Sequence, residues 1–268
     1  MQYYEIAPSY PLNRYIKAYW FLEGTIPAGY LQPERIFPDG CMELIIHYGD
    51  AFHKVNKNNI EKQLNSFVYG QLEEYIELLP SASTGVMGIK FYPQGLSHFT
   101  DVPVNEFKNL AIGLSNIFKN DCRQLEAAIS DAKDATERVA FVERFLYNCL
   151  KEPQTNNGLV NSIIADIYKS KGNITIAEIV QRYKTGERQV ERLVTQSVGL
   201  SPKLFSRIVR FQQVFNLAPA ANNLTGLALE AGYFDQAHFS REFKSFTGLS
   251  PRQFFKGQFE FSSYFLDD

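Results

Sequence analysis

Cysteine is scarce in this sequence, and its spacing excludes two classes of protein. Only three cysteines occur in 268 residues, at Cys41, Cys122 and Cys149. An odd number of widely separated cysteines fits neither a disulfide framework nor a zinc cluster. His47, His53 and His98 also lack paired His-x-His spacing, and a lone histidine is more often packed or exposed than metal-bound. We therefore expect no metal site and no bound cofactor.

Long hydrophobic runs are also missing. No stretch approaches the roughly 18 apolar residues of a membrane span. The N-terminal stretch MQYYEIAPSYPLNRYIKAYW has no basic segment followed by an apolar one. The sequence therefore predicts neither a membrane span nor a signal peptide. With reduced thiols, the cytoplasm is the simplest compartment.

Catalytic signatures are the third absence. The sequence has no nucleophile elbow, phosphate-binding loop or catalytic dyad, so we expect a protein that is not an enzyme. It does have 45% hydrophobic and 14% aromatic residues, which is too much apolar material for a disordered chain. Its length suggests two domains.

Charge is unevenly distributed along the chain. Residues 1–156 contain 14 Lys and Arg against 19 Asp and Glu, a net charge of −5. Residues 157–256 contain 13 against 7, a net charge of +6. An acidic domain joined to a basic one is a common plan for a nucleic-acid binder with a separate sensor. A basic face that is only solvated would give the same count, so charge alone does not decide.

Hydrophobic patterning predicts an α+β protein. In CMELIIHYGD one set of residues alternates with another, as in a strand with two different faces: Met42, Leu44, Ile46 and Tyr48 against Cys41, Glu43, Ile45 and His47. NSFVYGQ and GVMGIKFYP are further short strands. We expect a β-rich, barrel-like or sandwich-like regulatory or dimerisation domain over residues 1–150, with helices from about 110 to 150. A linker over 151–158, an all-helical domain over 159–256 and a tail over 257–268 follow.

The helical region contains an internal repeat. GLSPKLF (199–205) and GLSPRQF (248–254) share five of seven letters at an offset of 49 residues. Aligning backwards from these phrases pairs Gly186 with Asp235, each a plausible helix N-cap. It also pairs Arg192 with Arg241, and each arginine lies six residues after its cap. The repeat therefore predicts two similar units, each ending at a Gly-Leu-Ser-Pro stop.

Each unit is expected to be a short helix, a tight turn and a second helix. The first has helices at about 176–183 and 187–198, with Thr175 and Glu178 spaced as a capping box. The second has helices at about 226–231 and 236–247, with Gly232 at the turn and a cap-like Thr225. A long amphipathic helix over 204–218 joins them, with Arg207 and Arg210 able to face outward. This arrangement is a pair of helix-turn-helix units.

The second helix of each unit has residue types suited to reading DNA bases. Arg and Gln can form bidentate hydrogen bonds with guanine and adenine, and small side chains can meet the thymine methyl group. The candidates are Arg188, Gln189, Glu191, Arg192 and Gln196 in the first unit, and Gln236, Ala237, Ser240 and Arg241 in the second. A solvated polar face is the alternative, but it would carry Lys and Glu at least as often as Arg and Gln.

The repeat region resembles a known family. AGYFDQAHFSREFKSFTGLSPRQF (231–254) is similar to the signature of the AraC/XylS family of bacterial transcription regulators, and ITIAEIVQRYKTGERQVERLVTQSVGLSPKLFSRIVRFQQ (174–213) to the preceding half of its DNA-binding domain. The matching positions are Gly232, Tyr233, Asp235, Gln236, Phe239, Ser240, Arg241, Phe243, Lys244, Gly248 and Pro251. PERIFPDGCMELIIHYGD and GIKFYPQGLSHF more loosely resemble the N-terminal domain of one branch of the family. Gly186 departs from the usual serine-like cap, and Val194 from the usual phenylalanine.

The resemblance implies a promoter-binding transcription regulator. Two recognition helices would enter successive major-groove segments of double-stranded DNA, and the protein would recruit or block RNA polymerase. Carried over by position, the base-reading candidates above would divide between the two grooves, and the phosphate contacts would be Lys203, Arg207, Lys244 and Arg252. In this family the N-terminal domain commonly senses a small molecule or forms a homodimer.

The N-terminal domain offers ligand candidates without a recognisable constellation. Arg35, Glu43 and His47 lie in one segment with Asp39, and a barrel lumen could collect Glu43 and His47 from one strand face. A solvent-facing polar edge is the alternative. Apolar stripes within 122–150 can pack on the barrel or on a second subunit.

Two rival functions remain at this point. One is a DNA-localised enzyme with its chemistry in the N-terminal domain, although the clustered cysteines of alkyl-accepting repair proteins are missing. The other is an interaction module in which the two helical hairpins only provide packing.

Overall fold

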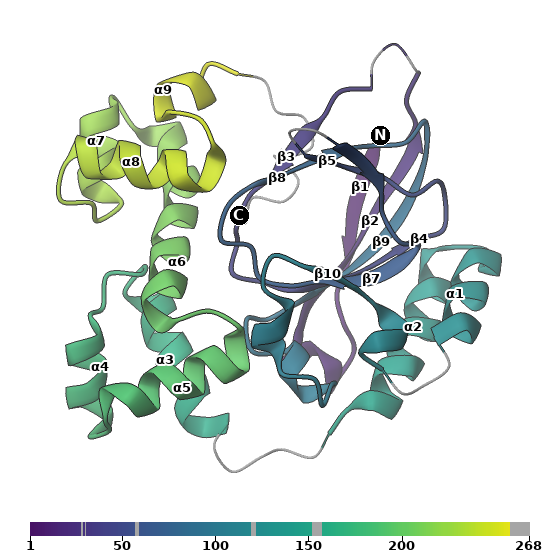
Figure 1. The fold of residues 1–268 in the computed structure, drawn as a ribbon, viewed down its shortest axis with the longest axis horizontal. Coiled ribbons are helices and arrows are strands. Elements are labelled where there is room, and N and C mark those ends of the chain that lie inside the picture. The colour runs from purple at the N-terminus through teal and green to yellow at the C-terminus, as the bar shows by residue number, and fades with distance from the viewer. Residues whose placement is uncertain (28, 30, 57–58, 119–121, 152–156, 258–268) are drawn as a thin grey trace.

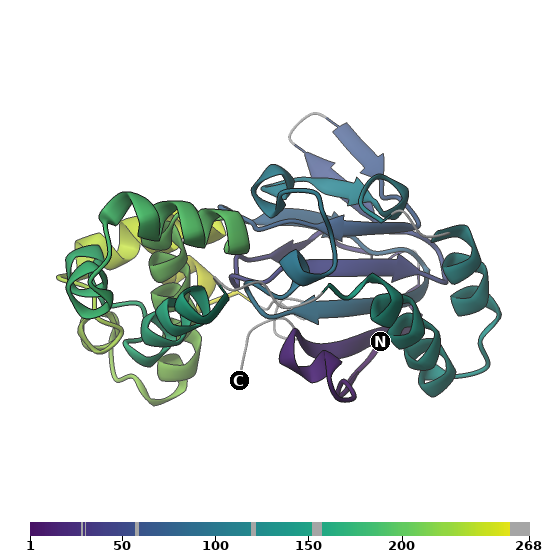
Figure 2. The same cartoon turned by 90° about the horizontal axis from the view of Figure 1, so that it is seen from below.

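The computed structural model describes the chain except for residues 28, 30, 57–58, 119–121, 152–156 and 258–268. A β-rich domain and a helical domain lie side by side (Figures 1 and 2). Most of the expected linker and nearly all of the expected tail fall outside the described residues. Within the described ranges, no helix is both long enough and apolar enough to cross a membrane.

The N-terminal domain contains two antiparallel sheets, which confirms the β-rich prediction. The larger sheet has the order β1-β2-β9-β4-β7-β10 and the smaller one the order β3-β8-β5-β6. The strands are β1 (Gln2–Ile6), β2 (Ile16–Thr25), β3 (Glu34–Ile36), β4 (Glu43–His47), β5 (His53–Asn56), β6 (Asn59–Lys62), β7 (Ser66–Tyr69), β8 (Ile76–Leu79), β9 (Ser83–Phe91) and β10 (Ala111–Gly113).

Strand β4 has the two faces that its sequence predicts. Met42, Leu44 and Ile46 are buried in the main core of the domain, between the larger sheet and its covering helices. Ile45 belongs to a second apolar cluster on the opposite face, with Phe67 from the adjacent strand β7 and Trp20 from β2, which lies beyond β9 in the sheet. The alternation arises because successive side chains of a strand point to opposite sides.

The expected helical start near residue 110 is wrong. Residues 111–113 form β10, an edge strand in which Ile112 pairs with Val68 of β7. Backbone pairing with an open sheet edge outweighs local propensity in so short a segment. The helices begin later, as α1 (Cys122–Asp131) and α2 (Ala135–Cys149).

Helices α1 and α2 pack on the larger sheet. Their stripe residues Leu125, Ile129, Val142 and Leu146 are buried in the same cluster as Leu44. In Figure 1 both helices lie on the side of the β-rich domain away from the helical domain. The stripes are therefore satisfied within the chain, and they do not offer an open apolar face for a second subunit.

The C-terminal domain is entirely helical within its described residues. Its elements are α3 (Asn157–Lys169), α4 (Ile176–Tyr183), α5 (Glu187–Val198), α6 (Pro202–Leu217), the 3₁₀ turn η6 (Ala218–Ala220), α7 (Leu224–Glu230), α8 (Gln236–Thr247) and α9 (Pro251–Phe254). The bounds of α4, α5 and α8 agree with the prediction. Helix α3 begins at Asn157, slightly before the start expected at residue 159.

Helix α7 corrects one predicted cap. Thr225 lies inside the helix, and Asn223 is the N-cap, with its side-chain oxygen accepting a 2.8 Å hydrogen bond from the backbone N–H of Gly226. Asn is as strong an N-cap as Ser or Asp. The capping box of Thr175 and Glu178 is present as predicted.

The two Gly-Leu-Ser-Pro phrases end one helix and start the next. Gly199 and Gly248 adopt φ values of 85° and 73°, in the left-handed region that favours glycine, and they end α5 and α8. Ser201 and Ser250 then cap α6 and α9, each accepting a backbone N–H two residues beyond the proline. The repeat is thus a compact stop-and-restart signal in both units.

Candidate nucleic-acid interface and ligand cavity

The base-reading candidates lie on the outward surfaces of α5 and α8. Eight of the nine are exposed, and Ser240 is half-buried. The opposite surfaces of these helices are buried in the core, through Val190 and Val194 on α5 and Phe239 and Phe243 on α8. Packing therefore fixes which residues each helix presents to solvent.

A basic groove runs between the two helix-turn-helix units. Its lining includes Lys203, Arg207, Arg210 and Arg241, together with the acidic residues Glu187 and Glu242. The groove brings together two of the predicted phosphate contacts, Lys203 and Arg207, with the predicted base reader Arg241. Lys244 and Arg252 are exposed but do not line it.

Arg207 and Arg210 do not simply face outward, as the sequence suggested. Both guanidinium groups contact Glu242, whose side chain is 5% exposed, at distances of 2.7 Å from Arg207 Nε and 3.3 Å from Arg210 Nη2. A buried carboxylate requires such partners because its desolvation is costly. Arg207 also lies over the ring of Phe246, and Arg210 over that of Tyr233. Glu242 therefore holds two cations in fixed positions on the groove wall.

Comparison with known protein families identifies the same helix-turn-helix region. A family described as a helix-turn-helix domain matches residues 179–257, which include the linking helix, the second hairpin and all but the first residues of the first hairpin. The C-terminal domain is an AraC-type helix-turn-helix domain. A domain of unknown function (DUF6597) matches residues 4–113, in the β-rich domain that precedes the AraC-type domain.

Individual proteins that are similar to this chain share little sequence identity with it. An uncharacterised helix-turn-helix transcriptional regulator of Haemophilus influenzae is 24% identical over 153 residues, covering 53% of this chain and 51% of its own length. The chain thus spans about half the length of this relative. Among solved structures, an apo ToxT variant from Vibrio cholerae strain SCE256 aligns over 88% of this chain and 96% of its own, with 16% identity and a TM-score of 0.44. ToxT from Vibrio cholerae in another crystal form covers 87% and 97%, with 12% identity and a TM-score of 0.45.

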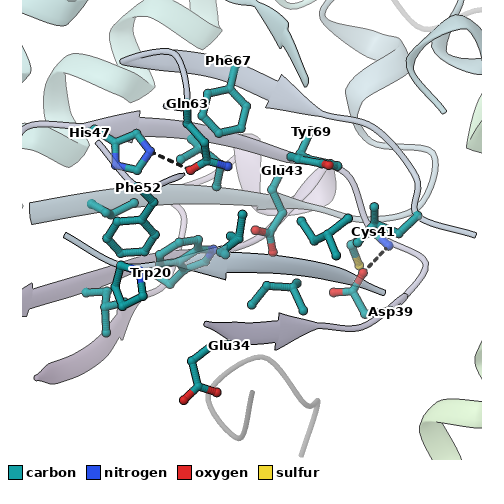
Figure 3. Close-up of a pocket in the computed structure, with 18 of the residues that line it drawn as sticks. Trp20, Glu34, Asp39, Cys41, Glu43, His47, Phe52, Gln63, Phe67 and Tyr69 are labelled. Atoms are coloured by element: carbon teal, nitrogen blue, oxygen red, sulfur yellow. Dashed lines mark hydrogen bonds between the residues drawn. The ribbon is translucent and has the colours of Figure 1, made fainter. Parts of the chain in front are cut away.

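The β-rich domain, joined to the AraC-type domain, contains a cavity between its two sheets. Figure 3 shows side chains converging on this space from β2, β3, β4 and β7. The space is about 880 Å³, including the part open to solvent. Of the three predicted ligand residues, Glu43 and His47 line it, whereas Arg35 does not. Among the described residues, no three His, Cys, Asp or Glu side chains form a cluster that could hold a metal ion.

His47 is buried at one end of the cavity. Its Nε2 lies 3.2 Å from Oε1 of Gln63, whereas Nδ1 is buried with no hydrogen-bond partner among the described residues. Burial lowers the pKa of His47 to about 4, so the ring is neutral near pH 7. Since a neutral ring that donates from Nε2 keeps a lone pair on Nδ1, His47 presents an unused acceptor.

Several cavity residues were not predicted from the sequence. The aromatic side chains are Trp20, Phe52, Phe67 and Tyr69, and Gln63 adds an amide. One signal was available for Trp20, because its β9 partner is Gly88 and a Cβ there would lie 1.9 Å from Trp20 Cε2. The glycine gives the indole space to lie flat across the strand. The other residues come from strands whose pairing the sequence does not reveal.

Arg35 contacts the helical domain instead of the cavity. Its Nη1 donates a 3.0 Å hydrogen bond to the backbone oxygen of Thr247, at the end of α8, and its Nε contacts Glu77 at 2.9 Å. The guanidinium also lies 4.4 Å from the ring centre of Tyr75. Arg35 thus joins the smaller sheet to the end of the second recognition helix.

The turn after β3 completes the contact between domains. Phe37 is buried in the core cluster of the helical domain, with its ring 5.5 Å from that of Phe254. The backbone oxygen of Pro38 accepts a 2.6 Å hydrogen bond from the buried side chain of Gln212 in α6. Because Phe37 and Asp39 also line the cavity, this turn belongs to both the cavity wall and the domain interface.

Both recognition helices end against the β-rich domain. A Cβ on Gly199 would lie 3.1 Å from the backbone oxygen of Val104, and a Cβ on Gly248 would lie 2.5 Å from Cε1 of Tyr75. The two Gly-Leu-Ser-Pro phrases therefore serve as docking points as well as helix stops.

Proposed function

We propose that the protein is a sequence-specific DNA-binding transcription regulator. The observation that carries the proposal is the basic groove of the AraC-type domain, which lies between two recognition helices with exposed Arg and Gln side chains. Clustered cations on one face supply phosphate contacts, and Arg and Gln supply base contacts.

The proposal assigns roles by position. Arg188, Gln189, Glu191, Arg192 and Gln196 read one major-groove segment, and Gln236, Ala237, Ser240 and Arg241 read the next. Lys203, Arg207, Lys244 and Arg252 contact phosphates, with Arg207 positioned by Glu242. Transcription then changes through recruitment or blocking of RNA polymerase.

The proposal also gives the β-rich domain a regulatory role. A small molecule in the cavity would contact the Phe37–Asp39 turn, which also touches α6 and α9. A ligand that favours one position of this turn shifts the balance between docked arrangements of the two domains. Homodimerisation would use a surface other than the apolar stripes of α1 and α2, which are buried in the domain core.

The test is binding of the full-length protein to genomic DNA fragments across a salt series. A regulator selects a few promoter fragments, and its affinity falls steeply with salt because bound phosphates release counterions. Equal binding to all fragments would overturn the proposal, as would unchanged selection after Arg192→Ala and Arg241→Ala.

A further inference from the structure

Helices α7 and α8 of the second helix-turn-helix unit are joined by a hydrogen bond between two exposed side chains. The Thr225 hydroxyl donates this bond to Oε1 of Gln236, at a distance of 2.7 Å. We propose that Thr225 is a positioning residue that sets the Gln236 amide to read an adenine in the major groove. This inference rests on the proposed function, because it takes Gln236 as one of the base-reading residues.

Helix caps fix the places of both partners. Thr225 is the second residue of α7, and the N-cap of that helix is Asn223. Because Asn223 already supplies the cap, the Thr225 hydroxyl is not needed for it and can serve Gln236. Gln236 is the first residue of α8, where the N-cap Asp235 accepts a 2.6 Å hydrogen bond from the backbone N–H of His238. Both side chains therefore start from well-defined backbone positions.

Buried side chains anchor the two helices that the hydrogen bond joins. Leu227 and Ala228 on α7, Tyr233 in the turn and Phe239 on α8 are each at most 3% exposed. Figure 1 shows α7 and α8 lying against each other. A long, flexible side chain loses rotamer freedom when a complex fixes it, and restraint before binding lowers that cost. The bond from α7 therefore prepares the Gln236 amide for a base before DNA arrives.

The amide of Gln236 still offers both an acceptor and a donor while Thr225 is bound to it. A carboxamide oxygen has two lone pairs and its nitrogen has two N–H donors, so Thr225 uses only one of the four positions. Adenine presents the N6 donor beside the N7 acceptor in the major groove, which matches the free lone pair and an N–H of the amide. Guanine presents two acceptors there, and cytosine and thymine one polar group each. Adenine is therefore the base that engages both ends of the amide.

The first helix-turn-helix unit has different residue types at the two corresponding positions. The second residue of α4 is Ala177, which has no hydroxyl, and the first residue of α5 is Glu187, which has a carboxylate in place of the amide. An ionised carboxylate only accepts hydrogen bonds, so Glu187 cannot donate to N7 of adenine. Adenine reading by a threonine-held glutamine therefore belongs to the second unit, and the two halves of the DNA site differ accordingly.

The first part of the test locates the base that Gln236 reads. Each base pair of a genomic fragment that the full-length protein selects is replaced in turn, and fluorescence anisotropy follows binding. Gln236→Ala should abolish the preference at one pair, which identifies it. We expect adenine there, preferred over guanine by about 5- to 150-fold in the unaltered protein, as for a bidentate contact. Replacing this adenine with 7-deazaadenine, which lacks the N7 acceptor, should weaken binding of the unaltered protein and leave binding of Gln236→Ala unchanged.

The second part connects this preference to Thr225. Thr225→Val keeps the shape of the exposed side chain and removes its hydroxyl, so it should lower the adenine preference at that pair by about 3- to 10-fold. Preferences at all other pairs should stay as they are. Thr225→Ser retains a hydroxyl and is the matched control, which should keep the preference. Combining Thr225→Val with Gln236→Ala should give the preference of Gln236→Ala alone, because Thr225 acts through Gln236. A purely structural role of Thr225 would weaken binding to every sequence equally.

Three outcomes would overturn the inference: no single base pair whose preference depends on Gln236, a base other than adenine at that pair, or an adenine preference that Thr225→Val leaves intact. The measurements with 7-deazaadenine use the unaltered protein, so they stand whether or not a variant folds. Selection of promoter fragments by the unaltered protein tests the proposed function separately. Fragment selection without an adenine preference that depends on Gln236 would therefore refute this inference and leave the DNA-binding function standing.

Discussion

The hydrogen bond between Gln212 and Pro38 allows a direct measurement of how strongly the two domains are joined. Gln212 Nε2 lies 2.6 Å from the Pro38 oxygen, and both residues are buried. Gln212→Leu keeps most of the side-chain volume and removes the donor. The Pro38 carbonyl then stays buried without this partner whenever the domains are docked.

The expected cost follows from two opposing effects. An unsatisfied buried carbonyl costs about 1–3 kcal/mol. Gln212 Oε1 is itself buried with no hydrogen-bond partner among the described residues, so replacing the amide removes one unpaired acceptor and offsets part of the loss. We expect a net destabilisation of about 1–2 kcal/mol, which shifts the docking equilibrium by about 5- to 30-fold.

Urea unfolding followed by two signals measures this cost. Trp20 fluorescence reports the β-rich domain, and far-ultraviolet circular dichroism mainly reports the helices. The free energy of unfolding from the helical signal should fall by about 1–2 kcal/mol in Gln212→Leu. Gln213→Leu, at the neighbouring half-buried position of α6, is the control. Equal stability of the two variants would refute the reasoning. An unchanged effect of ligand on the DNA affinity of Gln212→Leu would also refute it, because coupling between the two sites requires the domain contact.

Other predictions concern the groove and the cavity. Arg241→Ala should cost about 1–3 kcal/mol of binding free energy on a selected fragment and less on random DNA. Lys244→Ala should weaken binding to both kinds of DNA equally and lower the slope of log affinity against log salt concentration by about one. Fluorescence anisotropy across a salt series distinguishes these results. Glu242→Gln leaves Arg207 and Arg210 without their carboxylate and should cost about 2 kcal/mol of unfolding free energy in thermal denaturation, against no change for the exposed Glu230→Gln. The pKa of His47 is about 4 in the folded protein and 6.5 in its reference state, so the unfolded chain takes up the proton first as pH falls. Stability should therefore drop by roughly 3 kcal/mol in total between pH 6.5 and 4, and His47→Gln should lack this component in urea titrations at each pH.

Local features of the helical domain were predictable because local chemistry sets them. Helix α8 is capped by Asp235 before its first residue and by Gly248 after its last, and both residues act through hydrogen bonds or backbone angles within a few residues. The faces of β4 were predictable for a similar reason, since the alternation of Leu44 and Ile45 depends only on the strand period.

Features that depend on distant partners were not predictable. Arg35 was named as a ligand candidate, but its hydrogen-bond partner at Thr247 lies more than two hundred residues away in the chain. Residues 111–113 fall in the stretch expected to be helical, because the sequence around them does not reveal that they pair with the edge of β7. Arg210 was expected to face outward, and only the fold brings Glu242 to it. In each case a tertiary contact outweighed the local pattern.

The position of Phe37 limits how this architecture can be recombined. By sequence it belongs to the β-rich domain, but its ring fills a site in the helical core beside Phe254, and Gly40 lies close to Phe205. A chimera joined near residue 151 would bring a foreign side chain to that site and leave these rings facing a mismatched surface. Successful exchange of regulatory domains should therefore require residues 35–40 to be matched to the helical domain that receives them. Natural shuffling faces the same restriction, so the two domains are expected to be inherited as a docked pair.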